Sequence, residues 1–270
     1  SSMDVPKDST HFYYNCPDCF QVDLNRKSDR TIELNQIHSY EWEGIFLSPL
    51  HPDVNEHLLD VIKEIIYNYN IDGIHLDYIR FQDDFYGYNE YGLIEFEDKF
   101  SINPIDIKRG IISTRFGYEQ NFVDSIKYEW NKFKIDKVTE FVRSIKYLTL
   151  TDSLNIKISA AVKPSILESK YRWYQDWPLW IDQELLDFCV IMNYSQDLNV
   201  YNRINRIIMN EIKDNEKIYI GISVFNQSTA SISNKILYSR LEGFNQFSLF
   251  PYDLYKDTTN WYEPIYNNLN

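Results

Sequence analysis

The sequence has no excess of positive charge, few cysteines and no long apolar run, and each absence excludes a class of protein. Asp and Glu outnumber Lys and Arg by 40 to 27, which gives a formal net charge of −13. This balance argues against a nucleic-acid surface, because phosphate binding needs clustered Lys and Arg. Neither a signal peptide nor an apolar run of about 18 residues is visible, so no membrane span is expected, although a processed leader would have vanished from the chain.

Three cysteines do not make a disulfide framework. Cys16 and Cys19 form a Cys-Pro-Asp-Cys pair in a loop-like segment, which fits a short-range disulfide, a redox pair or half of a zinc site. No second CxxC and no His pair at metal-ligand spacing follows, so neither a structural zinc site nor another metal or cofactor is expected. Cys189 lies in an apolar run and is expected to be buried.

Aromatic residues are the compositional excess: 22 Tyr, 16 Phe and 6 Trp make up 16% of the chain. Many of these rings will lie in the core, and genome bias alone can raise their number. Exposed rings would instead form flat, amphipathic platforms suited to the apolar faces of sugars. Composition does not choose between the two interpretations.

The chain alternates strands and helices, which predicts parallel βα units in a single domain. Strands are expected at 72–77, 156–162, 187–193, 218–223 and 247–250, with a candidate sixth at 44–47. Helices are expected at 52–69, 122–148, 177–185, 200–213 and 230–242, with a long mixed insertion at 82–120. A closed barrel of such units needs eight strands, so the fold is either an open α/β sheet or a barrel without its N-terminal part.

The stretch 72–80 (Asp-Gly-Ile-His-Leu-Asp-Tyr-Ile-Arg) is the most informative feature. Alternation along the strand puts His75 and Asp77 on one face, which in a parallel α/β barrel points inward. Asp77 would then stand at the C-terminal rim, where the active sites of such barrels lie. An Asp that caps the following loop is the structural alternative. The neighbours Tyr78 and Arg80, and the aromatic-rich loop after them, favour a functional role.

Five stretches occur in the order and at the spacing of one known family: 46–54 (Phe-Leu-Ser-Pro-Leu-His-Pro-Asp-Val), 72–80, 158–162 (Ile-Ser-Ala-Ala-Val), 175–180 (Gln-Asp-Trp-Pro-Leu-Trp) and 186–194 (Leu-Asp-Phe to Met-Asn-Tyr). In them the sequence resembles the glycosyl-hydrolase-like family ten, a bacterial group of (β/α)8 barrels. The resemblance implies that Asp77 ends the fourth barrel strand and that the first three strands lie upstream, where this chain has no such pattern. Lys163 departs from the family, which has an aromatic or apolar residue after the fifth strand.

We therefore expect a TIM-type (β/α)8 barrel that is incomplete at its N-terminal side in this chain. Residues 1–42 would be an irregular N-terminal segment, and 43–270 the C-terminal part of a single barrel domain. Because unpaired strand edges invite association, either self-association or a missing N-terminal barrel segment is expected to complete the sheet. The resemblance also implies a secreted or periplasmic protein.

The resemblance implies a glycoside hydrolase, and most glycosidases use two carboxylates. Asp77 is the expected nucleophile, or the carboxylate that stabilises positive charge on the sugar ring. The acid is either Asp176, which would also suit a helix cap, or Asp197 after the sixth strand. Asp253, after the eighth strand, is a weaker candidate for the acid and is expected to belong to the substrate-binding site. Arg80 would either keep Asp77 ionised or form a surface ion pair in the following loop.

Further sugar contacts are expected from residues near the strand ends and from two tryptophans that suit stacking: His75, Tyr78, Asn193, Tyr194, Trp173 and Trp177. Each has a structural alternative, since such residues also serve as hydrogen-bonded or packed parts of a core. The predicted function is hydrolysis of an oligo- or polysaccharide. One alternative is a non-catalytic glycan-binding barrel, without a second carboxylate within about 5–10 Å of Asp77. Another is a polysaccharide deacetylase or other hydrolase, which the absence of a Gly-x-Ser-x-Gly elbow and of clustered His residues disfavours.

Overall fold

The computed structural model of the chain describes residues 6–31, 43–151, 155–251, 253 and 260–269. The chain divides into two compact units. The first, which we call the helical unit, consists of Ser1–Asn70, Arg80–Leu148 and Lys170–Gln175. The second, which we call the sheet unit, consists of Ile71–Ile79, Thr149–Ser169 and Asp176–Asn270. The domain division at residue 42 stays a prediction.

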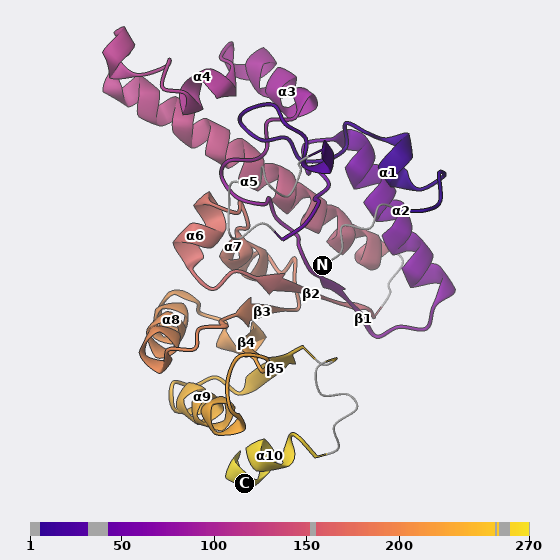
Figure 1. The fold of residues 1–270 in the computed structure, drawn as a ribbon, viewed down its shortest axis with the longest axis vertical. Coiled ribbons are helices and arrows are strands. Elements are labelled where there is room, and N and C mark those ends of the chain that lie inside the picture. Colours follow the sequence, from indigo (N-terminus) through magenta and orange to yellow (C-terminus); the bar gives the residue numbers. More distant parts are fainter. Residues whose placement is uncertain (1–5, 32–42, 152–154, 252, 254–259, 270) are drawn as a thin grey trace. The chain divides into compact units, whose positions relative to one another are not determined.

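The sheet unit is built on five parallel strands that follow one another in the order of the sequence (Figure 1). They are β1 (Gly73–Leu76), β2 (Lys157–Val162), β3 (Phe188–Met192), β4 (Ile218–Ser223) and β5 (Gln246–Phe250). The five predicted strands are confirmed, each within one residue of its expected ends. Among the described residues β1 and β5 are the edges, so the sheet is open, as expected for an incomplete barrel.

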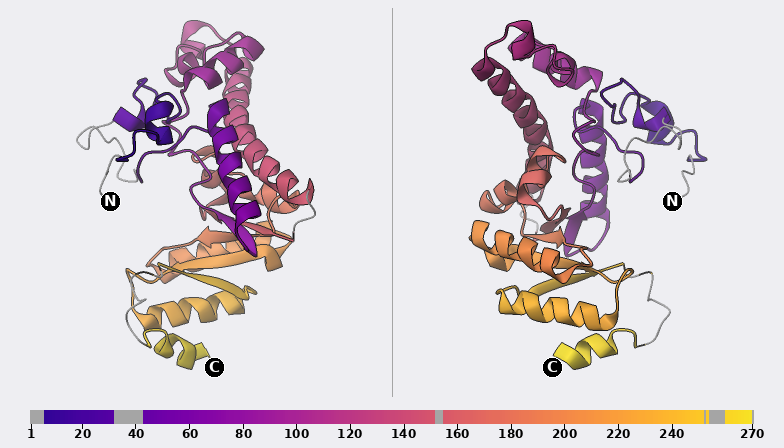
Figure 2. Two further views of the ribbon diagram at one scale, coloured as in Figure 1. Left: turned by 90° about the vertical axis from the view of Figure 1, so that its right-hand side faces the viewer. Right: turned by 60° about the vertical axis from the view of Figure 1, so that its left-hand side comes forward.

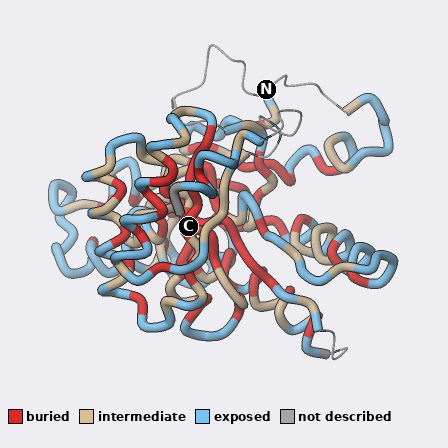
Figure 3. The backbone as a smooth tube through the Cα atoms, turned by 90° about the horizontal axis from the view of Figure 1, so that it is seen from below, coloured by how far each residue is buried: buried red, intermediate tan, exposed pale blue. Residues whose placement is uncertain are grey.

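The three central strands, β2, β3 and β4, are largely buried because their sequences are nearly continuous apolar runs. In β2 every residue after Lys157 is buried, and the middle residues of β3 are buried as well (Figure 3). Strands of parallel sheets that are covered on both faces have this composition. Cys189 in β3 is fully buried, as expected, and burial raises the pKa of its thiol.

Helices pack along the strands and follow the predicted positions. The chain here forms α6 (Ile166–Tyr171), α7 (Trp177–Asp182), α8 (Leu198–Glu211), α9 (Thr229–Leu241) and α10 (Glu263–Leu269), with a short 3-10 turn, η4 (Asn215–Lys217), before β4. Figure 2 shows α9 between α8 and α10. Ser228 begins α9 by accepting a hydrogen bond from the Ser231 N–H, which satisfies one of the free donors of the first turn. The short helices α6 and α10 were not predicted.

The helical unit contains two long helices and several short ones. These are α1 (Phe12–Asn15), α2 (Pro52–Asn68), α3 (Glu90–Phe100), α4 (Pro104–Lys108) and α5 (Gln120–Thr151), with 3-10 turns η1 (Asp29–Thr31) and η3 (Thr114–Phe116). The five predicted helices are confirmed within three residues of their ends, and the insertion at 82–120 carries α3 and α4. Within the described part of the chain, no helix is long and apolar enough to cross a membrane.

The N-terminal segment is held in place by side chains rather than by regular strands. Asn89, just before α3, donates from Nδ2 to the backbone oxygens of Asp18 and Phe20, and its Oδ1 accepts from the Val22 N–H. The predicted sixth strand at 44–47 is wrong, because Leu47 forms only an isolated antiparallel bridge with Phe20. This segment therefore adds no strand to the parallel sheet.

Candidate active site

Asp77 directly follows β1, at the C-terminal ends of the parallel strands, and is exposed. Its Oδ1 accepts a hydrogen bond of 2.8 Å from the Tyr78 N–H. Tyr78 has a φ of +55°, in the left-handed region that a bulky residue adopts only at a cost of about 1–2 kcal/mol. Backbone strain of this kind is concentrated at functional sites. The strained residue and the exposed carboxylate are neighbours at the mouth of the sheet.

Tyr194, two residues after β3, lies within electrostatic reach of Asp77. Burial, followed by the charges of Asp77 and Tyr78, raises the pKa of the Tyr194 hydroxyl to about 12. The Tyr194 ring stacks on Phe250 at the end of β5, with 5.8 Å between the ring centroids and 6° between the planes. The ends of three strands thus bring a carboxylate and three rings together.

His75 lies in β1, two residues before Asp77. Its Nδ1 is 2.9 Å from Oγ of Ser159 in the neighbouring strand β2. Burial lowers the pKa of His75, and the charge of Asp77 opposes that shift. The imidazole is therefore neutral at pH 7 and exchanges a hydrogen bond with a buried hydroxyl.

Exposed phenylalanines at two further strand ends were missed by the sequence analysis, which considered carboxylates, tyrosines and tryptophans but not phenylalanines. Phe225, two residues after β4, is 52% exposed, and Phe250 is 50% exposed. Tyr78 has a similar exposure of 51%. We call Tyr78, Tyr194, Phe225 and Phe250 the strand-end rings. The signal that could have found them is an aromatic residue at or just after the end of an apolar strand.

The three other candidate carboxylates lie in different surroundings within the sheet unit. Asp176 is 6% exposed and occupies the N-cap position of α7, yet its side chain makes no capping hydrogen bond. Asp197 is exposed and caps α8, because its Oδ1 accepts from the N–H groups of Asn199 and Val200. Asp253 is exposed. Of these residues, Asp197 is the one whose carboxylate is engaged by a helix terminus.

Two predicted sugar contacts of the sheet unit are buried. Asn193 donates from Nδ2 to the backbone oxygen of Tyr201 and to Oδ1 of Asn205, at 3.0 and 2.8 Å. Trp177 is fully buried and donates from Nε1 to the backbone oxygen of Lys163 at 3.1 Å. Both side chains use their N–H groups within the fold.

Arg80 and Trp173 belong to the helical unit. Arg80 is buried and forms an ion pair with Glu43, a partner that the sequence analysis did not foresee. Trp173 is also buried, with the Arg172 guanidinium 4.8 Å from its ring centroid. Its backbone oxygen accepts from the Phe81 N–H at 3.1 Å.

The loops at the strand ends are tied to each other by a buried lysine. Lys235, in α9, donates from Nζ to the backbone oxygen of Ser195 at 2.6 Å and to Oε1 of Gln227. Ser195 follows β3 and Gln227 follows β4. Burial lowers the pKa of Lys235. The lysine fixes the spacing of two loops that carry strand-end rings.

A second buried lysine lies in the helical unit, beside a cavity of about 400 Å³. The ammonium of Lys134 is 3.7 Å from the ring centroid of Tyr174 and 5.2 Å from that of Trp130, with Tyr88 and Phe81 within 6 Å. Such rings attract a cation through their negative faces. Burial nevertheless holds the pKa of Lys134 well below its usual value.

Comparison with known proteins agrees with the barrel geometry. The family described as glycosyl hydrolase-like 10 matches residues 22–239. No curated protein matches the sequence. The glycoside hydrolase domain of PgaB (BpsB) from Bordetella bronchiseptica is similar in structure, with a TM-score of 0.66 at 13% identity, over 87% of this chain and 67% of that chain. At this identity the likeness shows the fold alone, and it confirms an incomplete α/β barrel of the TIM type.

Proposed function

The chain belongs to the glycosyl hydrolase-like 10 family, and from that membership we propose that it hydrolyses a glycosidic bond in an oligo- or polysaccharide. The observation that carries the proposal is the exposed carboxylate of Asp77 at the end of β1, beside a strained tyrosine and stacked rings. The C-terminal strand ends are where barrel enzymes hold their catalytic groups.

Asp77 acts as the nucleophile or as the carboxylate that stabilises an oxocarbenium-like centre. The Tyr78 N–H orients one of its oxygens, so the carboxylate is held in place by the backbone of the next residue. His75, neutral on the same strand, hydrogen-bonds Ser159 and offers its other ring nitrogen to a sugar hydroxyl.

Asp176 is the proposed general acid, ahead of Asp197. Its carboxyl group is buried at the start of α7, whereas Asp197 is exposed and its Oδ1 accepts two helix N–H groups. The fold already uses the Asp197 carboxylate as the cap of α8, so it is less suited to turn toward a leaving group and protonate it.

The strand-end rings supply the binding surface for the sugar. The rings of Tyr194 and Phe250 are nearly parallel. Tyr194 is half-buried and Phe250 is exposed, which leaves ring surface for stacking against the apolar face of a pyranose. Trp173 and Trp177, both buried, are less suited to this role.

The test is the release of new reducing ends from a panel of polysaccharides. The protein is compared with Asp77→Asn and with Asp72→Asn, a matched change of an exposed residue at the opposite end of the same strand. We expect hydrolysis of at least one glycan by the parent protein and by Asp72→Asn, and its loss in Asp77→Asn. Glycan binding without hydrolysis by the parent protein would point to the non-catalytic binding barrel instead. Equal turnover in all three proteins would refute the role of Asp77.

A further inference from the structure

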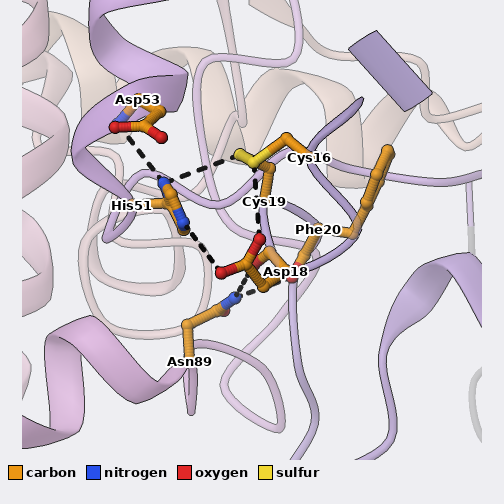
Figure 4. Close-up of a disulfide and its surroundings, with 7 residues drawn as sticks. All are labelled: Cys16, Asp18, Cys19, Phe20, His51, Asp53 and Asn89. Atoms are coloured by element: carbon orange, nitrogen blue, oxygen red, sulfur yellow. Dashed lines mark hydrogen bonds and ion pairs between the residues drawn. A yellow bond between two sulfur atoms is a disulfide. The ribbon is translucent and has the colours of Figure 1, made fainter. Parts of the chain in front are cut away.

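Four potential metal ligands meet in the helical unit, at the beginning of α2 (Figure 4). Cys16, Asp18, Cys19 and His51 each offer one donor atom, and these atoms all lie within 4.8 Å of one another. Two sulfurs, an imidazole nitrogen and a carboxylate oxygen are the ligand types that zinc takes in proteins. The sequence analysis set zinc aside for lack of a second ligand pair, but the fold supplies a single histidine 32 residues after Cys19.

The two cysteines form a disulfide in the structure, with 5.3 Å between their Cα atoms. The His51 ring is 1% exposed and faces this disulfide. Its Nδ1 lies 3.5 Å from Sγ of Cys19. A tetrahedral ion with Zn–S of about 2.3 Å and Zn–N of about 2.0–2.1 Å would separate the two ligand atoms by about 3.6 Å. The nitrogen and sulfur therefore already stand at the spacing that a shared zinc ion requires.

The remaining donor, Asp18, lies close to both sides of the cluster. Its Oδ1 is 3.5 Å from Sγ of Cys16, and its Oδ2 is 3.4 Å from Nε2 of His51. Nε2 is buried and makes no hydrogen bond in the described part of the chain, a costly condition for a polar atom. The His51 ring thus presents to Asp18 a nitrogen that the fold leaves poorly satisfied, while its other nitrogen faces the sulfurs.

Hydrogen bonds hold Asp18, Cys19 and His51 in place independently of the disulfide. His51 is the N-cap of α2, where Nδ1 accepts a long bond of 3.3 Å from the Asp53 N–H. Cys19 accepts a backbone bond of 2.7 Å from Ser48, and Asp18 accepts one of 3.1 Å from Nδ2 of Asn89. Reduction of the disulfide would thus leave two thiols beside a fixed histidine.

We propose that Cys16, Asp18, Cys19 and His51 form a redox-gated zinc site. A dithiol reductant transfers two electrons and two protons to the Cys16–Cys19 bond and is itself converted to a disulfide. The two thiols formed then lose their protons as they bind one Zn²⁺. Nδ1 of His51 gives up its long bond from the Asp53 N–H and becomes the third ligand, and the Asp18 carboxylate becomes the fourth. Exchange with a small-molecule disulfide reverses the step: the two thiolates form the Cys16–Cys19 bond again, the oxidant takes up two electrons and two protons from water to become two thiols, and the ion is released.

The experiment uses the protein in its disulfide form and after reduction by a dithiol, removed by gel filtration without oxygen. Co²⁺ is the spectroscopic probe, because thiolate ligation gives near-ultraviolet charge-transfer bands and a tetrahedral site gives intense visible bands. Zn²⁺ is then added and bound metal is counted by elemental analysis. We expect one ion per chain in the reduced protein, displacement of Co²⁺ by Zn²⁺, and no bound ion in the disulfide form.

Two variants test the sulfur and imidazole ligands, and a third is the control. Cys16→Ser/Cys19→Ser removes both sulfurs, and His51→Asn removes the imidazole while keeping an oxygen that can cap α2. The double serine variant should lose the charge-transfer bands, and His51→Asn should lose the intense visible bands of a tetrahedral site. Cys189→Ala, which removes the buried third thiol, should keep both. Circular dichroism checks folding of each variant. The proposal is overturned if the reduced parent protein binds no Co²⁺, or if binding is unchanged in the double serine variant.

Discussion

The N–H of Tyr78 donates a 2.8 Å hydrogen bond to Oδ1 of Asp77, from a residue whose own φ is +55°. The candidate nucleophile is therefore held by the backbone of the next residue, in a conformation that the strand end imposes. A bond from backbone to side chain of this kind survives when the carboxylate is replaced by an amide, since the amide oxygen also accepts. That property separates the folding role of Asp77 from its chemical role.

Asp77→Asn should leave stability nearly unchanged and abolish most turnover. The amide keeps the shape and the bond from the Tyr78 N–H, so the free energy of unfolding should change by less than about 1 kcal/mol. Only the carboxylate can attack or stabilise the sugar cation, and its loss should cost about 3 kcal/mol or more of transition-state binding. Thermal melting and turnover are measured on the same preparations. Near-normal turnover with a much lower melting temperature would make Asp77 structural.

Asp176 and Asp197 should respond in opposite ways to replacement. Asp176→Asn should lower turnover strongly on a natural glycoside but far less on a substrate with an acidic phenol leaving group, which needs no protonation. Asp197→Ala should cost about 1 kcal/mol of stability through the lost cap of α8, with turnover kept. Kinetics with the two substrates and denaturant titrations decide this. If the leaving-group dependence appears in Asp197→Ala instead, the acid is Asp197.

Asn193→Ala should destabilise the fold without changing glycan affinity. The side chain donates to Tyr201 and Asn205 in a buried setting, and removing it leaves both acceptors without that donor, at a cost of about 1–3 kcal/mol. Asn199→Ala, on the exposed surface of α8, is the matched control and should be nearly neutral. Stability is compared by the denaturant midpoints of the parent protein and the two variants. Glycan binding is measured at a temperature at which all three are folded. A loss of affinity at unchanged stability would make Asn193 a sugar contact after all.

Lys134→Met should stabilise the protein at pH 7, and the gain should shrink as the pH rises. Burial lowers the pKa of folded Lys134 below its value of about 10.4 in the unfolded chain. Between these two values the unfolded state binds more protons, so stability of the parent protein rises with pH through that window. Methionine does not titrate, so it contributes no such dependence of stability on pH, and it fills the same space between the rings. We expect the free energy of unfolding to rise by roughly 1–4 kcal/mol at pH 7.

Unfolding of the Lys134→Met variant and of the parent protein is measured by denaturant between pH 7 and pH 10. A gap in stability that widens with pH would contradict the sign of the pKa shift. A destabilised variant at pH 7 would mean that the contacts of the ammonium with Tyr174 and Trp130 outweigh the cost of its burial.

The parallel strands were predictable because each is a compact apolar run between polar turns. The start of α2 was equally clear, since Pro52 is suited to the first helical position. The run at 44–47 failed for a physical reason: the Phe46 N–H donates to the buried Asp29 carboxylate, so the segment is fixed by a side chain and not by a strand ladder. Helix α4 was missed although Asn103 caps it, because the surrounding insertion has no clear periodicity.

A residue of the candidate site was predictable only where its position follows from the secondary structure of its own segment. Asp77 ends a recognisable strand, so its place at the mouth followed from the alternation of β1. The stacking of Tyr194 on Phe250, and the approach of His51 to Cys19, depend on which distant segments the fold brings together. A single sequence carries no direct record of such pairs, so neither contact could be foreseen.

Each strand of the sheet pairs with the strand that precedes it in the chain, so assembly can proceed in the order of synthesis. The linking segment from β1 to β2 is about three times as long as those between later strands. A threefold longer loop costs about 1 kcal/mol more chain entropy to close. Pairing of β2, β3, β4 and β5 is therefore favoured to occur independently of β1, which makes the four C-terminal strands the natural nucleus for folding.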